Sequence, residues 1–122
     1  MTWVLDASAL LAFVGNEPGA ATVEDALASG AVCSAANWSE VAQRVLAVGG
    51  DWDLVSALLH SYGIEVVPVI TADAEWAAQR WRRGEGLSLG DRLCLALGDR
   101  LAAVVLTADR AWGTGEGVRQ IR

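Results

Sequence analysis

Acidic side chains recur in this 122-residue chain where they could assemble into one charged site. Asp6 directly follows the apolar run WVL, and Asp109 follows a second apolar run in LTAD. Glu40 lies in NWSEVAQR, and Asp91 lies in LSLGDRLCLAL. Two unit charges about 5 Å apart repel by roughly 3 kcal/mol at an effective dielectric constant of about 20. Carboxylates brought that close have to be protonated or hold a cation.

The basic residues narrow the chemistry that such a site could perform. All nine are arginine, so there is no lysine for a P-loop, for a Schiff base or for neutralising the carboxylates. His60 is the only histidine, which excludes a ribonuclease that relies on a histidine pair. Carboxylate oxygens without His or Cys ligands favour Mg²⁺ or Mn²⁺.

An acidic magnesium or manganese site is typical of phosphate chemistry. A bound ion can lower the pKa of water, orient an in-line attack and stabilise the leaving oxygen. The net charge of −6 repels a polyanion at long range, so binding has to come from metal ions and nearby arginines.

Each acidic residue also has an ordinary structural interpretation, and these alternatives stay open. Asp6 and Asp91 could be helix N-terminal acids that interact with the helix dipole. Glu40 could lie on a solvated helix face, and Asp109 could start a turn.

Short apolar runs alternate with helical periodicity, which predicts an α/β protein. Strands are expected at residues 2–5, 31–34, 64–69, 103–106 and 118–121. Helices are expected at about 7–14, from Pro18 to about Ser29, from 35 to Gly49-Gly50, after Asp51 to about Tyr62, from Thr71 through Trp81, and from Ser88.

We therefore expect a three-layer α/β/α sandwich with a parallel sheet of about five strands. Pro68 cannot donate to a strand ladder, so strand 64–69 belongs at an edge, which fits the order 3-2-1-4-5. Ligands then bind between strands one and four, at the carboxyl ends where Asp6 and Asp109 lie. Glu40 suits the same crevice. The position of Asp91 stays open, because its helix precedes a strand.

Length and hydropathy predict one domain over residues 1–122 with an ordinary core. No apolar run approaches the roughly 18 residues of a membrane span, and no signal peptide is evident, so we expect a cytoplasmic protein. Cys33 and Cys94 form no CxxC and are expected to be small buried residues.

The acidic motifs resemble those of a known nuclease family. LDASALLA (5–12), NWSEV (37–41), LSLGDRLCLAL (87–97) and LTADRAW (106–112) look like the four acidic motifs of PIN-domain nucleases. The chain is most similar to the VapC-type toxins of bacterial toxin–antitoxin pairs, and the GNEPG turn agrees.

The resemblance implies a Mg²⁺- or Mn²⁺-dependent endoribonuclease that cuts RNA and stops translation. By motif position, it assigns catalysis and metal binding to Asp6, Glu40, Asp91 and Asp109. Ser8 and Thr107 would orient carboxylates or waters, although helix capping or turn formation would also explain them. The family further implies a homodimer and a VapB-like antitoxin that covers the site.

Arginine and tryptophan side chains could contact the substrate. Arg92 and Arg110 each follow a site acid and are candidate RNA contacts, although either could pair with a carboxylate. Arg82 and Arg83 precede the glycine-rich GEG and could contact phosphate or end a solvated helix. Four tryptophans, at positions 38, 52, 76 and 81, are expected mainly in the core or an interface, with base stacking as the alternative.

Two other classes of function are alternatives to the nuclease. An aspartate-nucleophile phosphatase expects D-x-D and a lysine, but position 8 is serine and the chain has no lysine; a receiver domain also relies on lysine. A catalytically silent acidic binding module of the same fold remains possible. It predicts that RNA stays intact in the presence of Mn²⁺.

Overall fold

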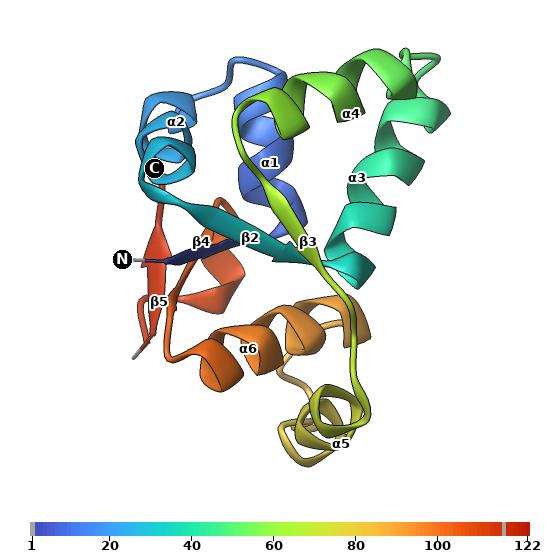
Figure 1. Cartoon of the computed structure of the whole chain (residues 1–122). Coiled ribbons are helices and arrows are strands. Elements are labelled where there is room, and N and C mark those ends of the chain that lie inside the picture. Colours follow the sequence, from blue (N-terminus) through green and yellow to red (C-terminus); the bar gives the residue numbers. More distant parts are fainter. Residues whose placement is uncertain (1, 116) are drawn as a thin grey trace.

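The computed structural model describes residues 2–115 and 117–122, which form a parallel sheet with helices on both faces (Figure 1). The strands are β1 (Trp3–Leu5), β2 (Ala31–Ser34), β3 (Glu65–Val67), β4 (Val104–Thr107) and β5 (Val118–Gln120). Their order is β3-β2-β1-β4-β5, and all four pairings are parallel. The predicted fold class and strand order are confirmed.

The helices divide between the two faces of the sheet. Helices α1 (Ala7–Val14), α2 (Ala20–Ser29), α3 (Ala35–Ala47) and α4 (Trp52–Ser61) lie on one side, and α5 (Thr71–Gln79) and α6 (Leu89–Leu101) lie on the other (Figure 1). A single turn of 3-10 helix, η1 (Arg110–Trp112), follows β4. None of the helices in the described residues is long and apolar enough to cross a membrane.

Each face of the sheet has its own hydrophobic core, because successive strand residues point to opposite faces. On the α1–α4 side, the strands contribute Leu5 and Leu106, whereas their neighbours Val4 and Val105 pack against α6. Cys33 and Cys94 are buried free thiols on opposite faces, as the sequence predicted. Burial raises the pKa of Cys33 to about 12, which keeps this thiol protonated.

Most helices and strands begin and end close to their predicted positions, with three corrections. Asp51 caps α4 as expected, through a 3.1 Å hydrogen bond from the Leu54 N–H to its Oδ1. Pro18 precedes α2 instead of lying in its first turn, because Gly19 adopts a left-handed φ of 97° and Ala20 begins the helix.

The other two corrections concern β3 and α5. Strand β3 spans only three residues and ends before Pro68, which lacks the N–H needed to extend the ladder. Helix α5 ends at Gln79, which leaves Trp81 outside it and 51% exposed. Trp81 therefore does not lie in the core, and the predictions of an interface or of base stacking remain for this residue. Trp38 and Trp52 do pack against the core and stack edge to face, with ring centroids 5.0 Å apart.

Candidate active site

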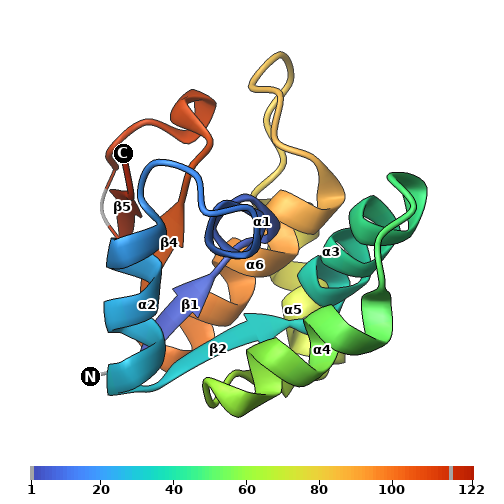
Figure 2. The same cartoon turned by 90° about the horizontal axis from the view of Figure 1, so that it is seen from above.

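The segments that contain Asp6 and Asp109 leave the sheet side by side, at the carboxyl ends of its two central strands. Strands β1 and β4 are neighbours, and Leu5 is in register with Leu106. The Asp6 N–H donates to the Leu106 carbonyl at 3.2 Å, so Asp6 leaves β1 beside the segment that leads to Asp109. Strand order reverses between β1 and β4, which creates the crevice where α/β sheets bind ligands. Figure 2 shows α1 rising from this edge of the sheet.

Asp6 is both a helix cap and a buried carboxylate. Its Oδ1 accepts hydrogen bonds from the Ala9 N–H at 2.8 Å and the Ser8 hydroxyl at 2.7 Å. Its Oδ2 accepts from the Thr107 hydroxyl at 2.5 Å. The side chain is almost fully buried, and burial raises its pKa from 3.8 to about 6 despite these hydrogen bonds, with the Asp91 charge adding to the rise. Ionising Asp6 is therefore costly in the absence of a cation.

Ser8 and Thr107 connect Asp6 to the chain that follows β4. The Ser8 Oγ accepts from the Ala108 N–H at 2.9 Å and lies 3.2 Å from the Thr107 Oγ1. Thr107 Oγ1 also accepts from the Asp109 N–H at 3.0 Å. The two hydroxyls thus fix the Asp6 carboxylate and set the path of the backbone toward Asp109.

Glu40 lies in α3, where Asn37 and Gly90 determine its position. The Asn37 Nδ2 donates to Glu40 Oε1 at 2.7 Å and to the Gly90 carbonyl of α6 at 3.2 Å. A Cβ at Gly90 would lie 2.6 Å from Glu40 Oε1, so only glycine leaves room for this carboxylate. Sequence reasoning missed both supporting residues. The signal for Asn37 was its spacing, since residues three apart lie on one side of a helix.

Asp91 occupies the first turn of α6, and the direction of this helix settles the question left open by the sequence. Helix α6 leads back to the start of β4, so its N-terminus lies at the carboxyl edge of the sheet. Asp91 forms a capping box with Ser88: the Ser88 N–H donates to Asp91 Oδ2 at 2.9 Å, and the Asp91 N–H donates to Ser88 Oγ at 3.1 Å.

Cys94 lies one turn along α6 from Asp91, and three of the carboxylates affect the pKa of its thiol. Burial raises the pKa of this thiol well above its ordinary value, and the charges of Asp6, Asp91 and Glu40 raise it further. The charges of Asp6, Glu40 and Asp91 therefore all act on one buried, protonated thiol, although they come from separate parts of the chain.

Among the residues that the structure describes, the side chains of Asp109 and of the two arginines predicted to contact the substrate form no hydrogen bond or ion pair with the other three acids. The Asp109 side chain is exposed and caps η1, accepting from the Ala111 N–H at 2.9 Å, which matches its interpretation as a turn start. Arg92 is half-buried, and its Nη1 donates to the Ala77 carbonyl at 2.7 Å, so it ties α6 to α5. Arg110 is exposed beside Asp109.

The donor set fits a hard divalent cation in its chemistry. It consists of carboxylate oxygens, and both nearby thiols are protonated. Glu40 Oε2 and Asp91 Oδ1 accept no hydrogen bond from the described residues, so each can turn toward an ion. As they stand, no three His, Cys, Asp or Glu side chains in the described part of the chain are grouped closely enough to bind a metal. Binding an ion therefore requires a rearrangement of side chains.

Comparisons with known proteins agree with this arrangement. The family model of the PIN domain matches residues 3–113, which include all four acidic motifs. No curated protein matches the chain. Among solved structures, a toxin–antitoxin complex from Klebsiella pneumoniae matches with a TM-score of 0.74 and 18% identity over 98% of this chain and 97% of the other.

Two further solved structures share the fold at low identity. A VapBC2 complex from Rickettsia felis bound to promoter DNA has a TM-score of 0.72 and 12% identity, with 98% of each chain covered. A DNA-bound VapBC from Salmonella typhimurium has a TM-score of 0.69 and 16% identity, covering 100% of this chain and 99% of that one. The match of the family model over nearly the whole chain, together with this shared fold, shows that the protein belongs to the PIN domain family.

Proposed function

We propose that this PIN domain is a VapC-type toxin that cleaves RNA in the cytoplasm with Mg²⁺ or Mn²⁺ and thereby inhibits translation. The observation that carries the proposal is the buried Asp6 carboxylate, whose ionisation is opposed by burial and by the nearby Asp91 charge. A cation that binds Asp6 together with Glu40 and Asp91 would relieve both costs.

The residues of the crevice would have different roles in such a site. Asp6, Glu40 and Asp91 would hold the ion, with Asp109 joining them if its side chain leaves the end of η1. When bound, the ion supplies an activated water and neutralises charge on the phosphate. Ser8 and Thr107 hold the Asp6 carboxylate in place, and Asn37 holds Glu40 against α6. Arg110 is the exposed arginine at the crevice for a phosphate contact.

We also propose a VapB-like antitoxin as the partner of this chain, and a homodimer as its assembly. The support is that two of the solved structures with this fold are VapBC complexes and a third is a toxin–antitoxin complex. Co-expression with a VapB-like antitoxin, followed by size-exclusion chromatography with light scattering, tests both statements.

Sequencing of RNA 5′ ends tests the nuclease. The chain is purified free of antitoxin and incubated with cellular RNA in Mg²⁺, in Mn²⁺ or in EDTA. We expect new 5′ ends that need the metal and disappear in Asp91→Asn. This variant retains a side-chain oxygen that can accept from the Ser88 N–H, so α6 keeps its cap. Identical cut maps for the wild type and Asp91→Asn would exclude the proposed function.

The alternative is a catalytically silent acidic binding module. The side chain of Asp109 is engaged in capping η1, and no ready-made group of three ligands is present in the described residues, which are the observations that favour it. It predicts intact RNA under every metal condition, and no change in melting temperature when Mn²⁺ is added.

A further inference from the structure

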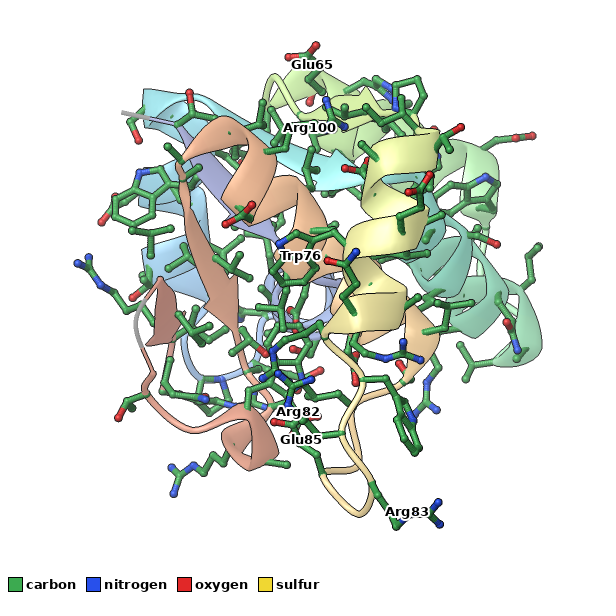
Figure 3. The ribbon with its side chains drawn as sticks, turned by 90° about the horizontal axis from the view of Figure 1, so that it is seen from below. Glu65, Trp76, Arg82, Arg83, Glu85 and Arg100 are labelled. Carbon is green, nitrogen blue, oxygen red and sulfur yellow. The ribbon has the colours of Figure 1, made fainter. Side chains whose placement is uncertain are left out.

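The segment that connects α5 to α6 projects from the fold beside the candidate active site. We refer to residues 80–87 as the α5–α6 loop. Figure 2 shows this loop extending from the body at the end where the segment after β4 also protrudes, and Figure 3 places both at the same end from the opposite side. The loop leads directly into Ser88 and the capping box of Asp91. It is therefore joined to the proposed catalytic acids by a short, structured path.

The α5–α6 loop is cationic on a protein that is acidic overall. It contains Arg80, Arg82 and Arg83 with Glu85 as its one acid, whereas the whole chain has a net charge of −6. Arg80 is neutralised by Glu85, with bonds of 2.6 and 3.0 Å to the two carboxylate oxygens. Within the described residues, Arg82 and Arg83 have no carboxylate partner. The charge of Arg82 also acts on the Glu85 carboxylate, whose pKa it helps to lower. Among the described residues of the loop, Arg83 is therefore the arginine that keeps its positive charge for a ligand.

Trp81 lies in this loop with half of its surface exposed. The guanidinium carbon of Arg83 lies 5.8 Å from the centroid of its ring. Arg83 thus lies over one face of the indole, and the rest of the ring is the part left for a ligand. An exposed aromatic ring with an arginine against it provides the two contacts that single-stranded nucleic acids use, base stacking and phosphate pairing.

Polar contacts within the loop restrain its conformation. The Arg82 Nη1 donates to the carbonyls of Gln79 at 2.8 Å and Trp81 at 2.9 Å. Figure 3 shows Arg82 beside Glu85, while Arg83 points away from the body at the tip. A site that is already ordered loses little conformational entropy when a ligand binds.

We propose that the α5–α6 loop is an RNA-binding element in which Trp81 stacks on a base and Arg83 contacts a neighbouring phosphate. The strand held there would continue into the crevice of Asp6, Glu40 and Asp91. The inference rests on the proposed function and deepens it, because it names the residues that position single-stranded RNA next to the acids.

Binding of a fluorescein-labelled single-stranded RNA of randomised sequence tests the proposal. Fluorescence anisotropy is measured with Mg²⁺ in the Asp91→Asn background, so that the probe stays intact. We expect Trp81→Ala to weaken binding roughly tenfold or more and Trp81→Phe to restore most of it. Arg83→Gln should reduce the slope of log K against log salt by about 0.7, since one phosphate contact to a single strand is lost.

Arg119→Gln is the matched control. The Arg119 guanidinium covers the Trp3 ring with its carbon 5.1 Å from the ring centroid, and its loss changes the net charge by the same amount. Trp3 begins β1, at the end of the strand opposite Asp6. We expect wild-type affinity and an unchanged salt slope for this variant.

Parallel cleavage assays, in a wild-type background, separate failure of this inference from failure of the proposed function. If the wild-type protein cleaves RNA in a metal-dependent way but Trp81→Ala binds RNA as tightly as its parent, the proposed function stands and the inference about the loop is overturned. Undiminished RNA binding together with loss of antitoxin binding would also overturn it, and would identify the loop as a protein contact. Absence of cleavage by the wild type would refute the proposed function, and absence of RNA binding by Asp91→Asn would refute the inference as well.

Discussion

Asp6 illustrates at the residue scale how a proposed catalytic group opposes the stability of the fold. Its carboxylate is held by two hydroxyls and one backbone N–H, yet burial still raises its pKa to about 6. Hydrogen bonds alone therefore do not replace the water that the charged group loses. The remaining cost is what a cation could offset.

We predict that Asp6→Asn stabilises the metal-free protein near neutral pH. The folded-state pKa is raised above 3.8, so the native state loses stability as the pH rises through that range, and the loss is complete above about 6. A shift of about two pKa units corresponds to about 3 kcal/mol at most, and asparagine avoids it while retaining a capping oxygen. Urea unfolding in EDTA measures the difference, which should shrink as the pH falls and vanish below about pH 3.

Asp51→Asn provides the control for this substitution. Asp51 also caps a helix through one carboxylate oxygen, but it is exposed and so carries no burial cost. The free energy of unfolding of Asp51→Asn should differ little from that of the wild type, both at neutral pH and at acidic pH. A wild-type protein more stable than Asp6→Asn at neutral pH in EDTA would contradict the assigned cause.

The sequence predicted which residues reach the crevice better than it predicted their hydrogen bonds. Asp6 could be placed because it directly follows a central strand, and Thr107 because it lies just before the last acid of the PIN-like motifs. The capping of η1 by Asp109 and the bond from Arg92 to the Ala77 carbonyl could not, because side chains choose among backbone partners that only the folded chain supplies. Asn37 was missed for the same reason.

At the element scale, the order of strands and helices followed from periodicity and from proline and glycine positions. Pro68 identified the edge strand, and the alternation of short apolar runs with helices required parallel pairing. The end of α5 was misplaced, because Trp76, Ala77 and Trp81 continue a helical pattern past the residue where the helix stops. Periodicity records which residues are apolar and not where the backbone turns.

Gly90 of α6 provides a test of how this helix determines the position of the Glu40 carboxylate. We predict that Gly90→Ala lowers RNA cleavage strongly while the free energy of unfolding changes by less than about 1 kcal/mol. The new methyl group would lie 2.6 Å from Glu40 Oε1, which is the mobile end of a long side chain and can move away. Moving it breaks the bond from Asn37, whereas alanine itself favours the helix. Single-turnover cleavage and urea unfolding measure the two effects.

Gly98→Ala, in the same helix, should give the opposite result. Its methyl group would lie 2.6 Å from the Val105 Cγ2, inside the core between α6 and the sheet. Overpacking there costs about 1–3 kcal/mol, but the crevice lies at the other end of the helix. We expect lower stability with normal cleavage below the melting transition. Equal activity losses in both variants would show that Gly90 acts only through folding.

The molecule as a whole carries two buried aspartates whose pKa values move in opposite directions. Asp73 receives two hydrogen bonds of 2.9 Å from the Arg100 guanidinium, which links α5 to α6 and lowers the pKa of this carboxyl. A lowered pKa contributes stability above about pH 4 that is lost as the pH falls further. Asp6 acts in the other direction, because its raised pKa makes stability fall as the pH rises from about 4 to about 6.

We therefore predict that the metal-free protein is most stable near pH 4, which is lower than is usual for a protein. Urea unfolding in EDTA across the acidic and neutral range measures this profile. In Arg100→Gln, the loss of stability on the acidic side should begin at a higher pH, because Asp73 then lacks its partner, and the fall in stability between about pH 4 and 6 should remain. In Asp6→Asn, the fall between about pH 4 and 6 should disappear, and the loss of stability at more acidic pH should remain.

Excess Mg²⁺ or Mn²⁺ should raise the free energy of unfolding of the wild type near neutral pH, since an ion that binds the ionised carboxylates stabilises the folded state by mass action. A wild-type protein that gains stability from pH 4 to neutral pH in EDTA would show that the crevice is not destabilised by its own charge, and the need for a cation would lose its physical basis.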